Sequence, residues 1–141
     1  MQVVPHVTNQ IMDWIERVAH IPTDGDGEPP DVCVIELGGT VGDIESAPFV
    51  EALRQFQMHH GYEHIAFVHV SLVPIISGEP KTKPTQHTVK ELRSAGLTPD
   101  ILACRSGEPL THAIRQKLAM FTQVHHQSEC LPSCWDDSAE N

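Results

Sequence analysis

Short apolar runs alternate along the chain with segments in which apolar residues recur at helical spacing. The run at 32–35 is continuous and rich in β-branched residues, which is typical of a strand buried on both faces of a parallel sheet. Three similar runs predict further extended segments, at residues 2–4, 65–73 and 101–104. The helical patterns predict four helices, with Thr8 and Thr111 as caps and Pro48 and Pro84 as first residues. This alternation predicts an α/β fold with a mostly parallel sheet and flanking helices.

Glycine and proline refine the expected boundaries in the second half of the chain. Residues 78–83 are expected to form a loop before Pro84, and Gly96 is expected to end the helix that follows. In the last helix, three apolar residues share the face that should point inward, namely Ile114, Leu118 and Phe121. In an open α/β sheet, ligands bind beyond the carboxyl ends of the strands. Those ends carry polar groups here: His6, Glu36, the 81–86 stretch and Arg105.

Composition narrows the class of protein. The 141 residues suffice for one domain, and 40% apolar with 5% aromatic residues suits an aliphatic core. No run approaches the roughly 18 apolar residues of a membrane span, and the first residues lack the pattern of a secretory leader. Cys33 and Cys104 lie in apolar runs, where free cysteine packs as a small apolar residue. We therefore expect a soluble, cytoplasmic protein with no membrane partner.

Charge is unevenly distributed along the chain. The formal net charge of −10 argues against a nucleic-acid partner. Residues 1–79 contain twelve Asp and Glu but only two basic residues, whereas seven of the nine Lys and Arg fall within 81–117. This distribution favours a small anion bound beside a metal ion that carboxylates hold. Alternatively, some of these basic residues only solvate helix faces, namely Lys90, Arg93 and Arg115.

The first candidate site comprises Glu36 and the loop at 38–45. A carboxylate directly after a buried strand is costly unless it is paired or binds a metal ion, although Glu36 could also mark the exposed end of that strand. The loop places three glycines, Asp43 and Glu45 within eight residues, so its backbone can approach a ligand closely. It lacks the Gly-Lys-Ser/Thr ending of a Walker A loop, and its glycines could serve only a tight turn.

The second candidate site is a stretch that runs into the start of a predicted helix, Lys81-Thr82-Lys83-Pro84-Thr85-Gln86. Free N–H groups and the helix dipole favour an anion there. Two lysines and two hydroxyls add donors that suit a triphosphate. The alternative is an exposed polar loop in which Thr85 merely caps the helix.

Zinc binding is weakly indicated. One group has irregular spacing that Pro132 interrupts: His125, His126, Cys130 and Cys134. In a second group, no i, i+4 pair has a third ligand in sight, and its members are interpreted as surface or core residues: His59, His60, His64 and His69.

Two motifs resemble a known family. Residues 32–46 (VCVIELGGTVGDIES) and 81–87 (KTKPTQH) closely resemble motifs of CTP synthase. The resemblance continues in order from Gln2 to about Val124 and includes residues 5–8 and 101–105. Residues 1–124 are therefore identified as part of the family's synthetase domain, which is P-loop-NTPase-like and Rossmann-like. Residues 125–141 do not resemble the family and are expected to form a divergent, disordered tail.

The resemblance implies a ligase that aminates UTP to CTP in pyrimidine nucleotide biosynthesis. In the family, ATP phosphorylates the uracil 4-oxygen, and ammonia, made from glutamine by a separate glutaminase domain, displaces the phosphate. Glu36 matches a ligand of Mg²⁺, and Arg105 matches the ATP side. The residues that match the site for UTP and for CTP, the feedback inhibitor, are Asp43, Ile44, Glu45, Lys81, Thr82, Lys83, Pro84, Thr85, Gln86 and Lys117. The family forms homotetramers.

Three departures from the family pattern affect these expectations. The P-loop and a second magnesium-binding aspartate would precede Met1, the connection at 74–78 is short, and no glutaminase domain follows. We therefore expect an incomplete synthetase domain that is inactive alone. The alternatives are a non-catalytic module that binds CTP or UTP or joins subunits, and a chain that does not fold stably because a central strand is absent.

Overall fold

The computed structural model describes residues 3–23, 25 and 27–124. These residues fall into two compact units, the first ending at Ile65 and the second beginning at Ala66, and each unit is described by itself. The tail predicted for residues 125–141, with its four candidate zinc ligands, lies outside the described residues.

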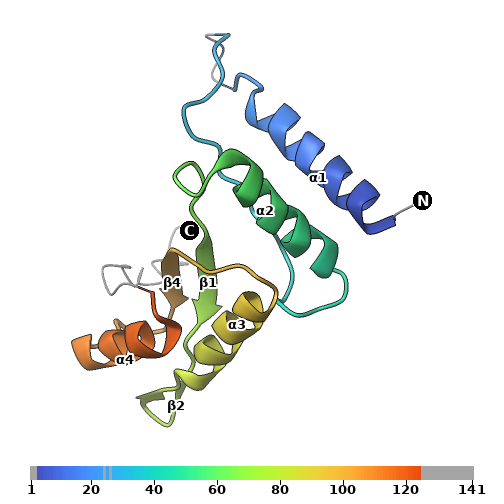
Figure 1. Ribbon diagram of the computed structural model, residues 1–141. Coiled ribbons are helices and arrows are strands. Elements are labelled where there is room, and N and C mark those ends of the chain that lie inside the picture. The colour runs from blue at the N-terminus through green and yellow to red at the C-terminus, as the bar shows by residue number, and fades with distance from the viewer. Residues whose placement is uncertain (1–2, 24, 26, 125–141) are drawn as a thin grey trace, which may run out of the picture. The chain divides into compact units, whose positions relative to one another are not determined.

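The first unit contains two helices that pack together, α1 (Val3–Ala19) and α2 (Ala47–His60) (Figure 1). The prediction of an extended segment at 2–4 is wrong for Val3 and Val4, which are helical. Pro5 is compatible with this because the first turn of a helix does not need its N–H. Thr8 is not a cap either. It is fully buried within α1, and its hydroxyl lies 3.1 Å from Gln55 Oε1 of α2.

The strand predicted at 32–35 is absent from the structure. This segment is irregular, and Val32 and Val34 are 76% and 91% exposed. A strand forms only where a neighbour pairs its N–H and C=O groups, and the described residues of the first unit contain no strand. The β-branched pattern is therefore not realised. Because His6 lies in α1, neither His6 nor Glu36 stands at a strand end in this structure.

The second unit is built on two parallel strands, β1 (Val68–Leu72) and β4 (Ile101–Arg105), with α3 (Lys83–Ser94) between them in the chain (Figure 1). Their register pairs Val68 with Ile101 and Leu72 with Arg105. The parallel pairing and the flanking helices confirm the predicted α/β class. One face of the sheet packs on α3 and on α4 (His112–Thr122) around a core of Val73, Val89, Leu102, Cys104, Leu110, Leu118 and Val124.

The opposite face of this sheet is not covered within the unit. Val70 and Leu72 are each 61% exposed, so these strands alternate between a buried and an exposed side. Burial on both faces was expected for 101–104 and is not found. Phe121, predicted to point inward, is also exposed, whereas Leu118 is buried as predicted.

A short hairpin precedes α3, where a loop was predicted. Strands β2 (Ile75–Ile76) and β3 (Glu79–Pro80) pair in antiparallel fashion. The turn residues Ser77 and Gly78 have φ values of 54° and 76°, as a two-residue type I′ turn requires. The chain then enters α3 at Lys83, one residue before the predicted start. Gly96 follows α3 with φ of 87°, and Thr111 caps α4 by accepting from the Ile114 N–H, both as predicted.

Candidate functional site

The loop before α2 holds the first set of candidate residues. Gly39 and Gly42 have φ values of 95° and 98°, so they do provide left-handed turns. Buried Ser46 organises the loop, because its hydroxyl lies 3.1 Å from the Thr40 carbonyl oxygen and 2.9 Å from that of Asp43. Three residues of this loop are exposed, namely Asp43, Ile44 and Glu45.

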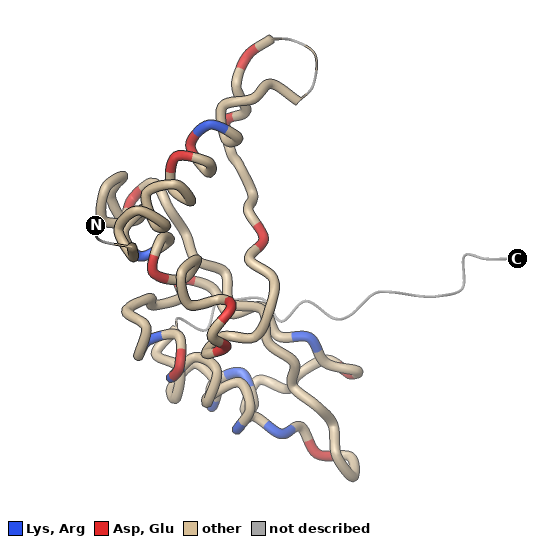
Figure 2. The backbone as a smooth tube through the Cα atoms, turned by 90° about the vertical axis from the view of Figure 1, so that its right-hand side faces the viewer, with Lys and Arg blue, Asp and Glu red and all other residues tan. Residues whose placement is uncertain are grey.

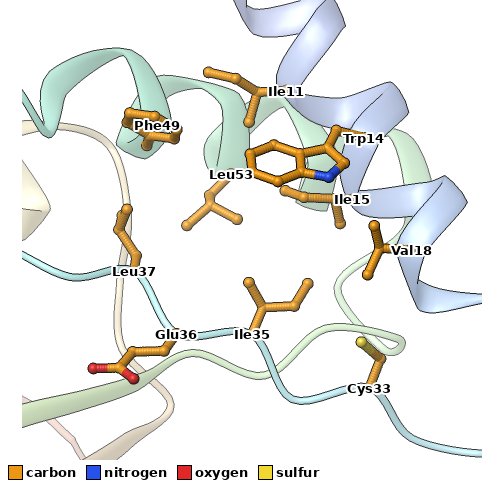
Figure 3. A pocket seen from close by; sticks show the side chains of 10 residues that line it. All are labelled: Ile11, Trp14, Ile15, Val18, Cys33, Ile35, Glu36, Leu37, Phe49 and Leu53. Atoms are coloured by element: carbon orange, nitrogen blue, oxygen red, sulfur yellow. The ribbon is translucent and has the colours of Figure 1, made fainter. Parts of the chain in front are cut away.

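Glu36 borders a hollow of about 360 Å³ in the first unit. Figure 3 shows its carboxylate directed away from the centre of this hollow, toward which Ile35 points. The remaining lining residues are apolar or carry a thiol: Ile11, Trp14, Ile15, Val18, Cys33, Leu37, Phe49 and Leu53. The hollow therefore has no Lys or Arg side chain to bind a phosphate, and its mainly apolar lining does not match that of a nucleotide site. Cys33, expected in a packed strand, is exposed.

Metal-ligating side chains do not gather in the described part of the chain. No group of three His, Cys, Asp or Glu there could hold a metal ion. Of the four histidines in the second candidate group, His59, His60 and His64 are exposed. His60 Nε2 lies 2.9 Å from Glu16 Oε1, and His69 is buried.

Glu36 presents a single exposed carboxylate. This fits Mg²⁺, which proteins often hold through one or two carboxylates together with substrate phosphates and water.

The second set of candidate residues surrounds the start of α3. Lys83 and Pro84 are exposed, and the Lys81 side chain is 42% exposed. Lys81 Nζ lies 2.6 Å from Glu79 Oε2, and this bond lowers the pKa of Glu79. The pairing of Glu79 with Lys81 was not predicted, although an acid two residues before a lysine indicates a possible ion pair. Lysine Nζ groups and the free N–H groups of the first helical turn are suitable donors for phosphate oxygens.

The two threonines of this stretch are buried. Thr82 is the N-cap of α3 and accepts from Gln86 Nε2 at 3.1 Å. Thr85 is fully buried, and its hydroxyl lies 2.9 Å from Ser71 Oγ. It is therefore not the exposed cap that was considered as an alternative. Ser71 is the second residue that the sequence reasoning missed.

Backbone hydrogen bonds join Arg105 to the hairpin that carries Lys81. The Val73 N–H donates to the Arg105 carbonyl oxygen at 2.8 Å, and the Lys81 N–H donates to that of Pro74 at 2.9 Å. Both bonds lie near the carboxyl ends of β1 and β4, so Arg105 and the start of the 81–86 stretch are joined to the same edge of the sheet. Lys117 is exposed on α4. Figure 2 shows lysine and arginine concentrated in residues 66–124, whereas acids predominate in the first unit.

Comparison with known proteins decides the family. A family model described as CTP synthase N-terminus matches residues 1–133. The chain belongs to the CTP synthase family. It is 60% identical over 124 residues to a CTP synthase of Schizosaccharomyces pombe, and 65% identical over 124 residues to one of Eremothecium gossypii. These alignments cover 88% of the chain but 21% and 22% of the relatives.

A CTP synthase from Dictyostelium discoideum is covered to a similar extent. It is 60% identical over 126 residues, which are 88% of this chain and 22% of that relative. The chain therefore spans about a fifth of the length of the CTP synthases that it matches. Within the described residues, no helix is long and apolar enough to cross a membrane.

Proposed function

We propose that this chain contributes the pyrimidine-nucleotide part of a cytoplasmic CTP synthase, a ligase that aminates UTP with ATP and glutamine-derived ammonia. The arrangement at the start of α3 carries the proposal. There Lys81 and Lys83 reach solvent at the N-terminus of α3, where the helix dipole favours an anion. The identity of 60 to 65% to CTP synthases supports the assignment.

In the first unit, the residues proposed to bind UTP and CTP are the exposed Asp43, Ile44 and Glu45, whose chemistry suits contact with hydroxyls and a base. In the second unit, the residues proposed for these ligands are the 81–86 stretch and Lys117, which suit the triphosphate. Arg105 is proposed for the ATP side, and the assembled enzyme is proposed to be a homotetramer.

Glu36 is the proposed magnesium ligand. Mg²⁺ at this carboxylate would neutralise part of the triphosphate charge. Glu36 would supply one oxygen ligand to this ion. Within the second unit, Lys81 and Lys83 are the residues proposed to balance phosphate charge.

Calorimetric titration of the full chain with CTP and MgCl₂ tests the proposal. Lys81→Ala and Lys83→Ala should each weaken binding roughly tenfold or more, because each removes a charge-assisted hydrogen bond. Lys90→Ala is the matched control, since Lys90 is also exposed on α3, and it should leave the affinity unchanged. Absence of CTP binding by the wild-type chain, or equal affinity in all variants, would refute the proposal. Binding without turnover of UTP, ATP and ammonia would instead support the module that only binds nucleotide.

A further inference from the structure

We propose that Thr85 and Ser71 are positioning residues, which hold the start of α3 in the orientation that a triphosphate needs. This inference rests on the proposed function. Thr85 has no exposed surface, although it lies in the motif whose lysines are proposed to bind phosphate. Its hydroxyl faces the sheet and not solvent, so any contribution to nucleotide binding acts through its neighbours.

A directed chain of hydroxyl bonds links α3 to the carboxyl end of β1. Ser71 Oγ donates to Thr85 Oγ1 at 2.9 Å, and Thr85 Oγ1 donates to the Leu72 carbonyl oxygen at 3.4 Å. Thr85 is the third residue of α3, and Leu72 is the last residue of β1. The chain of bonds therefore joins the first turn of the helix to the strand end from which the hairpin departs.

The Ser71–Thr85 hydrogen bond lies close in the structure to the backbone of both candidate lysines. Lys83 stands two positions before Thr85 in the same helical turn. The Lys81 N–H is fixed in turn to the Pro74 carbonyl oxygen, two residues beyond Leu72. Both lysines are thus connected to the Ser71–Thr85 bond through short, hydrogen-bonded backbone. Donors to a ligand must be held to within about 0.5 Å for full effect, and a buried hydroxyl pair is suited to that task.

A second bond between the same two elements serves as an internal comparison. His69 Nε2 lies 2.9 Å from Thr88 Oγ1, whose hydroxyl donates to the Thr85 carbonyl oxygen at 3.1 Å. His69 therefore donates and Thr88 accepts. This bond also joins β1 to α3, but Thr88 lies nearly one turn farther from the helix start. A purely structural role would make the two threonines equivalent, whereas a positioning role would not.

The experiment compares Thr85→Val, Thr85→Ser, Ser71→Ala and Thr88→Val in the full chain. Melting temperature is measured for each, and the affinity for CTP with MgCl₂ is measured by calorimetry well below the lowest melting temperature. We expect Thr85→Val to weaken binding roughly tenfold and Ser71→Ala by a smaller factor, because both loosen the donors of the first turn. Thr85→Ser keeps the hydroxyl and should restore most of the affinity. Thr88→Val should lower the melting temperature and leave the affinity unchanged.

Several outcomes would overturn the inference. Thr85→Val and Thr88→Val that lose stability alike but bind CTP like wild type would show that the Thr85 hydroxyl is only structural. If Thr85→Val does not fold, unchanged affinity in Ser71→Ala would have the same meaning. Lys81→Ala, measured in parallel, separates this inference from the proposed function. Wild-type affinity in Lys81→Ala refutes the site itself, whereas weakened binding in Lys81→Ala with unchanged binding in the Thr85 and Ser71 variants refutes only the positioning role.

Discussion

Replacing Glu51 by glutamine should destabilise the first unit at neutral pH and remove a loss of stability on acidification. The Glu51 carboxylate accepts from Arg54 Nε and Nη2 at 2.9 and 2.8 Å, and from Gln55 Nε2 at 2.7 Å. Gln55 Oε1 accepts in turn from the buried Thr8 hydroxyl at 3.1 Å. The ion pair therefore begins a polar chain that joins α2 to α1. These bonds, chiefly those from Arg54, lower the pKa of Glu51 from 4.5 to about 2.

The sign and size of the effect follow from proton binding. Because the carboxyl pKa is lower in the folded state, the stabilisation is present above pH 4.5 and is lost as the pH falls through about 2. A shift of this size would amount to roughly 3 kcal/mol without screening. The Arg54 and Glu51 side chains are 40% and 33% exposed, and exposed pairs contribute at most about 1 kcal/mol. We therefore expect Glu51 to contribute about 1 kcal/mol at pH 7, most of which is lost by pH 2.

Urea denaturation at several pH values measures this contribution. Trp14 in α1 provides a fluorescence signal for the first unit when Trp135 is replaced by phenylalanine in every variant. Glu51→Gln should be less stable than its parent at pH 7, and the difference should shrink toward pH 2. Asp13→Asn, which removes an exposed acid of α1, is measured alongside as the control variant. A difference that is zero at pH 7, or constant across the range, would refute the reasoning.

Three further predictions concern the second unit and the loop before α2. Burial lowers the pKa of His69 below 6.5, so its contribution to stability should be full above pH 6.5 and fall as the pH drops toward the folded pKa; His69→Gln should flatten that part of a urea-derived stability profile. Leu118→Ala should lower the free energy of unfolding by about 2 to 5 kcal/mol, because Leu118 is 2% exposed in the core, and calorimetric melting would reveal an unexpectedly small cost. Ser46→Ala should weaken CTP binding by less than Lys81→Ala, since it releases the loop without removing a proposed ligand contact, and equal affinity to wild type would exclude that role.

The second half of the fold could be predicted from sequence because its signals are local. Pro84 and Gly96 bracket α3 within a few residues of its true ends, and Thr111 caps α4 through its own side chain. Each of these residues acts on backbone only one to four positions away, so the residues that determine where each helix begins or ends are close together in the sequence. The parallel pairing of β1 with β4 then follows from a helix that intervenes between two apolar runs.

The run at 32–35 shows where this reasoning stops. Its β-branched residues favour extended backbone, but strand pairing also needs a neighbouring strand, which the local sequence pattern does not reveal. Val3 and Val4 show the same limit in the opposite direction, because they carry β-branched side chains and still form the first turn of α1. Propensity is a weak prior that contacts elsewhere in the fold override.

The candidate site likewise contains residues whose exposure can be predicted from neighbouring sequence and residues whose partners are distant in the sequence. Lys81 and Lys83 are readable as phosphate donors from their charge and from the helix that follows, and burial does not remove either from solvent. Thr85 has the same apparent chemistry in sequence, yet its hydroxyl bonds to Ser71, fourteen positions earlier. That partner depends on how α3 lies against β1, so only the structure separates a residue that can touch phosphate from one that can only hold the lysines in place. The roles proposed for the lysines and for Thr85 therefore differ, and burial is the observation that distinguishes these residues.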